Sequence, residues 1–216
     1  MLAENDLPDA ERRRFTANVQ SQSERLQTLI DKLLRLAQLE QQRELDAPGT
    51  INMHELFADL EQTMSAQATK RGITVRFAAE PELQVTGDRF LLSLALNNLL
   101  QNALDFSPQE GTVTCTAETD GTNVVLRIQD QGHGIAEYAC ERIFERFFSL
   151  PRPDGAPKST GLGLPLVHEI AVLHGGEIRL ENSPEGGVVA ILSIPHKIAN
   201  KRENSQSQPK AGSTIA

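Results

Sequence analysis

The sequence has 216 residues and a net charge of −8 at pH 7, which is enough chain for one or two domains with hydrophobic cores but argues against broad nucleic-acid binding. The two cysteines, Cys115 and Cys140, lack a metal-binding spacing, so we expect reduced thiols in a cytoplasmic protein and no zinc site. No apolar run reaches the roughly 18 residues of a membrane span, and the N-terminus has no signal-peptide pattern, so we expect no membrane contact by this segment.

Residues 6 to about 46 are predicted to form one long helix, which begins near Asp6 and Pro8. Apolar residues recur along it at alternating steps of four and three, which is a heptad pattern. Such a helix, roughly 60 Å long, cannot bury its stripe on a small domain, so we expect partner helices and a homodimer. The alternative is a helix folded onto its own domain. The stripe comprises Phe15, Val19, Gln22, Leu26, Leu29, Leu33 and Leu36, widened by Ile30, Leu34 and Leu39.

The Pro and Gly in "DAPGT" predict a linker at 47–51, and residues 52–196 form a second unit. This unit is predicted to be α+β, a two-layer α/β sandwich with helices on one face of a sheet. Residues 197–216 are polar and are expected to be a disordered tail. Helices are predicted at 52–70, 88–106, 137–147 and 162–174, and strands at 73–79, in "GTVTCTAET" and "TNVVLRIQD" around the turn at 120–122, and in the closing pair "GEIRLENS" and "GGVVAILSIP".

Two amides, Asn98 and Asn102, lie four residues apart on the predicted helix 88–106 and therefore share a face. Amide oxygens are suitable ligands for Mg²⁺, which also keeps waters and substrate phosphates. The alternative is that they cap or bridge neighbouring backbone.

The segment "DQGHGI" follows a predicted strand and combines Asp130 with Gly132, Gly134 and Ile135. The glycines allow a ligand to approach the backbone, and Asp130 could accept a hydrogen bond from an exocyclic amine. The same pattern also describes many ordinary turns.

The segment "STGLGL", which includes Thr160, Leu162 and Leu164, leads into the helix at 162–174. Gly161 and Gly163 in it resemble phosphate-cradling loops, in which backbone N–H groups at a helix start meet an anion. Between this segment and "DQGHGI" lie Phe144, Phe147 and Phe148, a cluster that by default indicates core packing. The Pro- and Gly-rich stretch after the cluster is typical of a mobile loop that closes over a ligand.

In this order, the features resemble the catalytic ATP-binding domain of sensor histidine kinases, in the gyrase/Hsp90/MutL-like ATPase superfamily. "NLLQNALDFS" resembles the N box, "DQGHGI" and "GLGL" the two glycine boxes, and "FERFF" the F box. "RIFERFFSLPR" and "NALDFSP" resemble CreC-type kinases within that family. The long helix is similar to the second helix of the family's dimerisation and phosphotransfer hairpin.

The resemblance implies ATP and Mg²⁺ as cofactors, with Asn102 holding Mg²⁺ on the triphosphate and Asn98 supporting the phosphates or the metal. Asp130 would bind the adenine amino group, and Phe106 would lie beside the base. The remaining residues implied to contact the nucleotide are Asp105, Gly132, Gly134, Ile135, Phe147, Thr160, Gly161, Leu162, Gly163 and Leu164. Transfer of the γ-phosphoryl to a histidine, and then to the receiver domain of a response regulator, would depend mostly on positioning and charge neutralisation.

One departure from the family pattern is Asp105, where many members carry Lys or Arg. A carboxylate there would repel phosphates unless it faces the metal or solvent. We therefore expect the phosphate-binding cation to come from Arg146, Arg152 or Lys158.

The second departure is the absence of the acceptor motif, which resembles Ser/Thr-His-Glu-Leu-Arg-Thr-Pro in the family. His54 and His168 precede a glutamate but lack the rest of the motif. We expect His54 on the outside of a helix, His133 in an exposed turn or beside the nucleotide, and the acceptor on a helix before residue 1. Full-length relatives are anchored in the inner membrane by regions expected to be absent here.

The sequence thus predicts the ATP-binding part of a protein-histidine kinase that does not autophosphorylate by itself. The alternatives are another ATPase or serine kinase of the superfamily, and a nucleotide-binding or dimerising regulator without turnover.

Overall fold

Buried and exposed side chains alternate along β4 (Thr112–Thr119) and β7 (Val188–Pro195), so each strand has one face in the core. The computed structural model describes residues 9–153, 155 and 159–196 and places these strands in a five-stranded sheet of order β2-β4-β5-β7-β6. β2 and β4 pair in parallel, and the other neighbours pair antiparallel. The remaining strands are β2 (Thr74–Ala79), β5 (Asn123–Gln129) and β6 (Glu177–Asn182).

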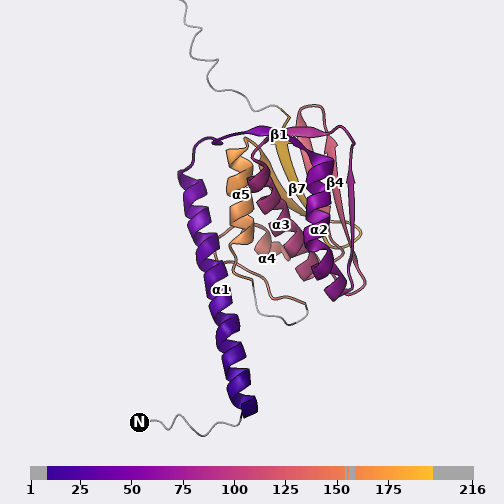
Figure 1. Cartoon of the computed structure of the whole chain (residues 1–216). Coiled ribbons are helices and arrows are strands. Elements are labelled where there is room, and N and C mark those ends of the chain that lie inside the picture. Colours follow the sequence, from indigo (N-terminus) through magenta and orange to yellow (C-terminus); the bar gives the residue numbers. More distant parts are fainter. Residues whose placement is uncertain (1–8, 154, 156–158, 197–216) are drawn as a thin grey trace, which may run out of the picture.

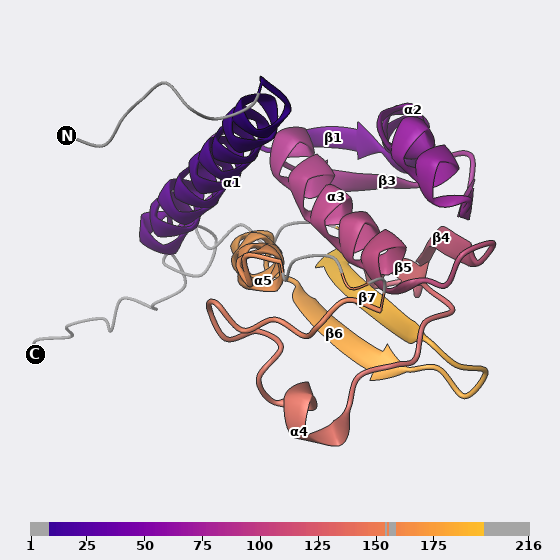
Figure 2. The same cartoon turned by 90° about the horizontal axis from the view of Figure 1, so that it is seen from below.

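Three helices cover one face of this sheet: α2 (Met53–Arg71), α3 (Arg89–Phe106) and α5 (Gly163–Leu173). Figures 1 and 2 show these three helices as one layer against the sheet. The long helix α1 (Asp9–Gln41) lies beside α5. The strongly apolar α3 lies in the middle and is buried along most of its length. The predicted α/β sandwich preceded by a long helix is confirmed.

The starts of α2 and α3 are fixed by side-chain caps. Asn52 Oδ1 accepts from the Glu55 N–H at 3.1 Å, and Asp88 Oδ1 accepts from the Leu91 N–H at 3.0 Å. α2 buries Met53, Leu56, Phe57, Leu60 and Met64 against the domain. His54 is exposed on its outer side, as expected.

In its C-terminal half, the long helix α1 packs on the domain through Leu29, Leu36 and Leu39. Leu36 and Leu39 are buried, whereas Phe15 and Leu26 are 66% and 59% exposed. α1 contacts α5, and its N-terminal part extends beyond the domain (Figure 1). The alternative, a helix folded onto its own domain, is therefore met for the C-terminal part of the stripe. The rest of the stripe is exposed in this single chain, and the expected partner helices stay a prediction.

Several boundaries differ from the prediction. The first helix ends at Gln41 rather than near residue 46, and the helix expected at 137–147 is reduced to α4 (Glu137–Cys140), followed by turns. The segment expected as a linker contains β1 (Gly49–Asn52), which pairs with β3 (Gln84–Gly87) in a separate two-stranded sheet. The predicted tail at 197–216 and the predicted helix start at Asp6 and Pro8 lie outside the described residues.

Candidate functional site

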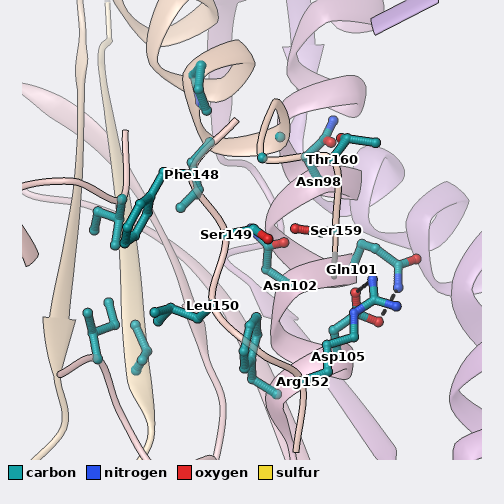
Figure 3. Close-up of a pocket in the computed structure, with 18 of the residues that line it drawn as sticks. Asn98, Gln101, Asn102, Asp105, Phe148, Ser149, Leu150, Arg152, Ser159 and Thr160 are labelled. Carbon is teal, nitrogen blue, oxygen red and sulfur yellow. Dashed lines mark hydrogen bonds and ion pairs between the residues drawn. The ribbon is translucent and has the colours of Figure 1, made fainter. Parts of the chain in front are cut away.

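A cavity of about 410 Å³ opens between α3, the start of α5, the loop after β5, the segment 143–152 and α1. Most of the predicted site residues form its wall: Asn98, Asn102, Asp105, Phe106, Asp130, Gly134, Ile135, Thr160, Gly161, Gly163 and Leu164. Gly132, Arg146, Phe147 and Leu162 are not in the wall, and Lys158 lies outside the described residues. In the close-up of Figure 3, Asn98 and Thr160 lie together, Asn102 faces Ser149 and Ser159, and Asp105 lies beside Arg152.

Asp130 is a buried carboxylate at one end of the cavity, with 6% of its surface exposed. Its Oδ1 accepts from the Gly132 N–H at 2.8 Å and from the Val188 N–H at 3.2 Å, while Oδ2 has no hydrogen-bond partner among the described residues. Burial raises the pKa of Asp130, and the two N–H groups and nearby His133 oppose the rise. The side chain is thus held by one oxygen and offers the other as an acceptor.

Hydrogen bonds to β6 and close packing on α3 hold the loop that carries the first glycine box. Asn182 on β6 accepts from the Ile135 N–H at 2.6 Å and donates to the Ile135 carbonyl at 2.8 Å. Gly132 lies against α3, where an added Cβ would be 2.6 Å from the Phe106 carbonyl oxygen. Gly132 therefore packs against α3 and does not line the cavity.

Apolar and aromatic side chains surround Asp130. Ile135, Leu180 and Val188 line this end of the cavity, and the Phe106 ring stacks on the exposed His133 ring with their centroids 6.2 Å apart. A flat heterocycle with an exocyclic amine fits such a compartment, because it needs apolar contact on its faces and one acceptor at its edge.

The opposite end of the cavity is polar. The Asn98 Nδ2 donates to the Leu94 carbonyl at 2.8 Å, and the Asn98 Oδ1 accepts from the Lys32 Nζ at 3.2 Å. Gly163 at the start of α5 lies so close that an added Cβ would be 3.2 Å from this amide oxygen. Asn102, one turn further along α3, has no hydrogen bond to another described residue. The two amides therefore face the cavity from one side of α3, as their spacing predicts.

Asp105, which was expected to repel phosphates unless it faced the metal or solvent, is compensated in a third way. It is 3% exposed, and its Oδ1 accepts from Arg71 at 2.6 Å and from Gln101 at 2.8 Å. Its Oδ2 is paired with Arg152. Two guanidinium groups thus neutralise this carboxylate, which removes the predicted repulsion of phosphates.

The segment that resembles the F box turns sharply at Phe147, whose φ is +65°. Its N–H donates to the Gly161 carbonyl at 2.9 Å, and the residue is 61% exposed and does not line the cavity. Phe148 lines the cavity in its place. Gly161 has a φ of +68°, and an added Cβ would be 2.5 Å from the Phe147 carbonyl carbon, so only glycine fits there. Leu162 is fully buried in the core.

Two of the three predicted phosphate-binding cations are paired with carboxylates in the structure. Arg146 pairs with Glu40 on α1, and Arg152 pairs with Asp105. The prediction for Lys158 lies outside the described residues. A cation that the sequence analysis missed, Lys32, reaches the cavity from α1.

Four residues of α1 in the cavity wall had not been expected: Ser21, Gln22, Arg25 and Lys32. Burial lowers the pKa of Lys32, and the charge of Asp105 raises it. Gln22 is a member of the heptad stripe, which predicted a helical partner rather than a cavity. The other three carried no sequence signal, because polar residues beside a heptad stripe normally belong to the solvated face of a helix.

Comparison with known proteins places this geometry in a family. Residues 87–198 match the family model of histidine kinase-, DNA gyrase B- and HSP90-like ATPases. The chain is 43% identical over 181 residues to the sensor protein CreC of Escherichia coli strain K12, a match that covers 84% of this chain and 38% of CreC. The chain belongs to the sensor histidine kinase family. The resemblance inferred from its N, F and glycine boxes is confirmed.

Two solved histidine kinases share the arrangement of the long helix and the sandwich. Full-length ShkA in complex with AMPPNP matches with a TM-score of 0.74 at 28% identity, covering 91% of this chain and 41% of that chain. ThkA in complex with the response regulator TrrA matches with a TM-score of 0.72 at 27% identity, covering 91% and 54%. This chain is thus the catalytic ATPase region of a histidine kinase and is shorter than these relatives.

Two searches of the described residues gave negative results. No helix in ranges 9–153 and 159–196 is long and apolar enough to cross a membrane. The same part of the chain contains no cluster of three or more His, Cys, Asp or Glu side chains that could hold a metal ion.

Proposed function

We propose that this chain binds Mg·ATP and transfers the γ-phosphoryl group to a histidine on a helix that the sequence does not contain, from which it passes to the receiver domain of a response regulator. The observation that carries the proposal is that one cavity is lined by Asp130, Asn98 and Asn102. Asp130 is buried, and only one of its two carboxylate oxygens accepts hydrogen bonds from the described residues. The AMPPNP bound to ShkA and the response regulator bound to ThkA support it.

The base compartment would be responsible for specificity. The free oxygen of Asp130 would accept a hydrogen bond from the amino group of adenine, and Ile135, Leu180 and Val188 would contact the ring. Guanine presents a carbonyl at the corresponding edge, which would place two acceptors against each other. We therefore expect ATP to be preferred over GTP.

The polar end would hold the phosphates and Mg²⁺. The residues present fit this role, because Asn98 and Asn102 offer hard amide oxygens and Gly163 leaves room beside Asn98. When bound, Mg²⁺ would neutralise charge on the phosphates during transfer. The chain itself would position the phosphates and exclude water, which is where most of its contribution to the rate would arise.

The acceptor is proposed to come from elsewhere because none of the five histidines is suited to the role. His54, His168 and His196 are exposed away from the cavity, and His174 is buried in the core. His133 lines the base compartment rather than the polar end. The uncovered stripe of α1, with Phe15, Leu26 and other apolar residues, is proposed to pair with hairpin helices of a second copy.

The test uses γ-labelled ATP with the chain alone and with an added helical hairpin that carries an acceptor histidine. Acid-labile label should appear on the hairpin and not on the chain. Acid-labile label on the chain alone would contradict the missing acceptor. Binding of ATP without transfer to any hairpin would favour a second candidate, a nucleotide-binding regulator without turnover. Asp105 no longer favours this candidate, because the two arginines neutralise its carboxylate.

A further inference from the structure

We propose that Lys32 of α1 contacts the phosphate chain of the bound nucleotide, so that the long helix supplies a phosphate-binding cation to the catalytic domain. This proposal rests on the proposed function and names a residue of that same site. Lys32 lies on a different element from the N box and the glycine boxes, 66 residues before Asn98.

The position of Lys32 on α1 is the first argument. Leu29, Lys32, Leu36 and Leu39 recur at helical spacing, and the leucines of this set are buried or partly buried against the domain. Lys32 thus occupies the packed stripe of α1 rather than its solvated face. Lysine is rarely buried unless its ammonium has a partner, so a lysine at this position needs one.

The partners of Lys32 are the second argument. Its Nζ donates to the neutral amide oxygen of Asn98 at 3.2 Å. The carboxylate in the cavity wall whose charge acts on Lys32 is that of Asp105. This carboxylate is already paired with Arg71 and Arg152. The protein's own groups therefore compensate the ammonium of Lys32 only in part, and an anion beside Asn98 would complete its coordination.

The place of Lys32 in the cavity is the third argument. The polar end also contains Asn102 and the glycines at the start of α5, so a phosphate chain held there lies within reach of the Lys32 ammonium. Arg152, which also lines the cavity, is paired with Asp105. Lys32 is thus suited to meet the negative charge of a triphosphate.

This contact couples the nucleotide to the docking of α1. Leu36 and Leu39 fix the helix on the domain, and Glu40 pairs with Arg146 one turn after Leu36. Because Lys32 reaches the cavity only while α1 is docked, nucleotide binding should favour the docked helix, and release of the helix should weaken binding.

The test compares the variants Lys32→Met, Lys32→Arg and Lys70→Met with the wild type. Lys70 is an exposed lysine on α2 and gives a matched loss of one positive charge. Each protein is titrated with Mg·ATP and with adenosine, and its melting temperature is measured without nucleotide. Loss of a charge-assisted contact should weaken Mg·ATP binding by Lys32→Met roughly 10- to 100-fold. Adenosine binding should not change, and Lys32→Arg should restore part of the affinity.

The melting temperature separates this role from a structural one. Without nucleotide, Lys32→Met should melt at or above the wild-type temperature, because it removes a partly compensated buried charge. Equal Mg·ATP affinities of Lys32→Met and Lys70→Met would overturn the proposal, and so would an equal loss of adenosine binding. If the wild type binds no Mg·ATP, the proposed function itself fails.

Discussion

Replacing Asp105 by Asn should destabilise the fold by roughly 2–4 kcal/mol, because two guanidinium groups then lose their counter-charge. Asp105 is 3% exposed and accepts from Arg71 and Gln101, and it also pairs with Arg152. Breaking one partner from a buried ion pair costs roughly 3–5 kcal/mol. The side chains of Arg71 and Arg152 retain 26% and 20% exposure, so water recovers part of this cost and the expected value is lower.

The assay is thermal and urea unfolding of Asp105→Asn beside Asp59→Asn. Asp59 pairs with Arg89 at 2.7 Å, close to the 2.6 Å of Asp105 and Arg71, but both members of this pair are exposed. An exposed pair contributes roughly 0–1 kcal/mol, so the control should melt within a few degrees of the wild type. For a domain of this size, Asp105→Asn should melt roughly 4–12 °C lower. Equal effects of the two variants would refute the argument that burial makes the Asp105 cluster stabilising.

Three further predictions concern α1, the thiols and pH. Leu36→Ala should lower the free energy of unfolding by roughly 2–4 kcal/mol, because it leaves a cavity where the buried Leu36 of α1 packs on the domain. Hydrogen exchange along α1 should become faster, and unchanged exchange would contradict docking through this residue. Burial raises the pKa of Cys115 to about 12, so a disulfide reagent at pH 8 should titrate only the exposed Cys140 in the folded protein, and two rapid thiols would contradict this. Burial lowers the pKa of His174 more than the Ile170 carbonyl and Asp88 raise it. The unfolded chain therefore binds the extra proton first, and stability should fall as pH drops below about 6.5; His174→Gln should flatten this dependence, and an unchanged slope would contradict it.

The elements that repeat a pattern were predictable from the sequence. The apolar α3 and the alternating β4 and β7 each carry their signal within one segment, and the predicted sandwich is confirmed. β1 and β3 have only four residues each, too few for an alternation to stand out. The residues after α4 form turns that lead to Phe147, whose N–H donates to the Gly161 carbonyl, a contact that no local pattern encodes.

The candidate site likewise combines residues that local motifs predict with long-range contacts that no local motif encodes. Asp130, Asn98 and Asn102 stand in local motifs, and the structure brings them to one cavity. The pairing of Asp105 with Arg71 and Arg152 joins residues 34 and 47 positions apart, so the sequence alone suggested repulsion where the structure has neutralisation. Lys32 was missed for the same reason.

The most direct test of the account is a titration of the wild type and Asp130→Asn with a fluorescent ATP analogue in the presence of Mg²⁺. The wild type should bind, and Asp130→Asn should bind at least about tenfold more weakly, because the amide replaces a charged acceptor. Asp59→Asn, which changes an exposed carboxylate far from the cavity, should bind like the wild type. Absence of binding by the wild type, or equal binding by Asp130→Asn, would contradict the assignment of this cavity as an adenine-nucleotide site.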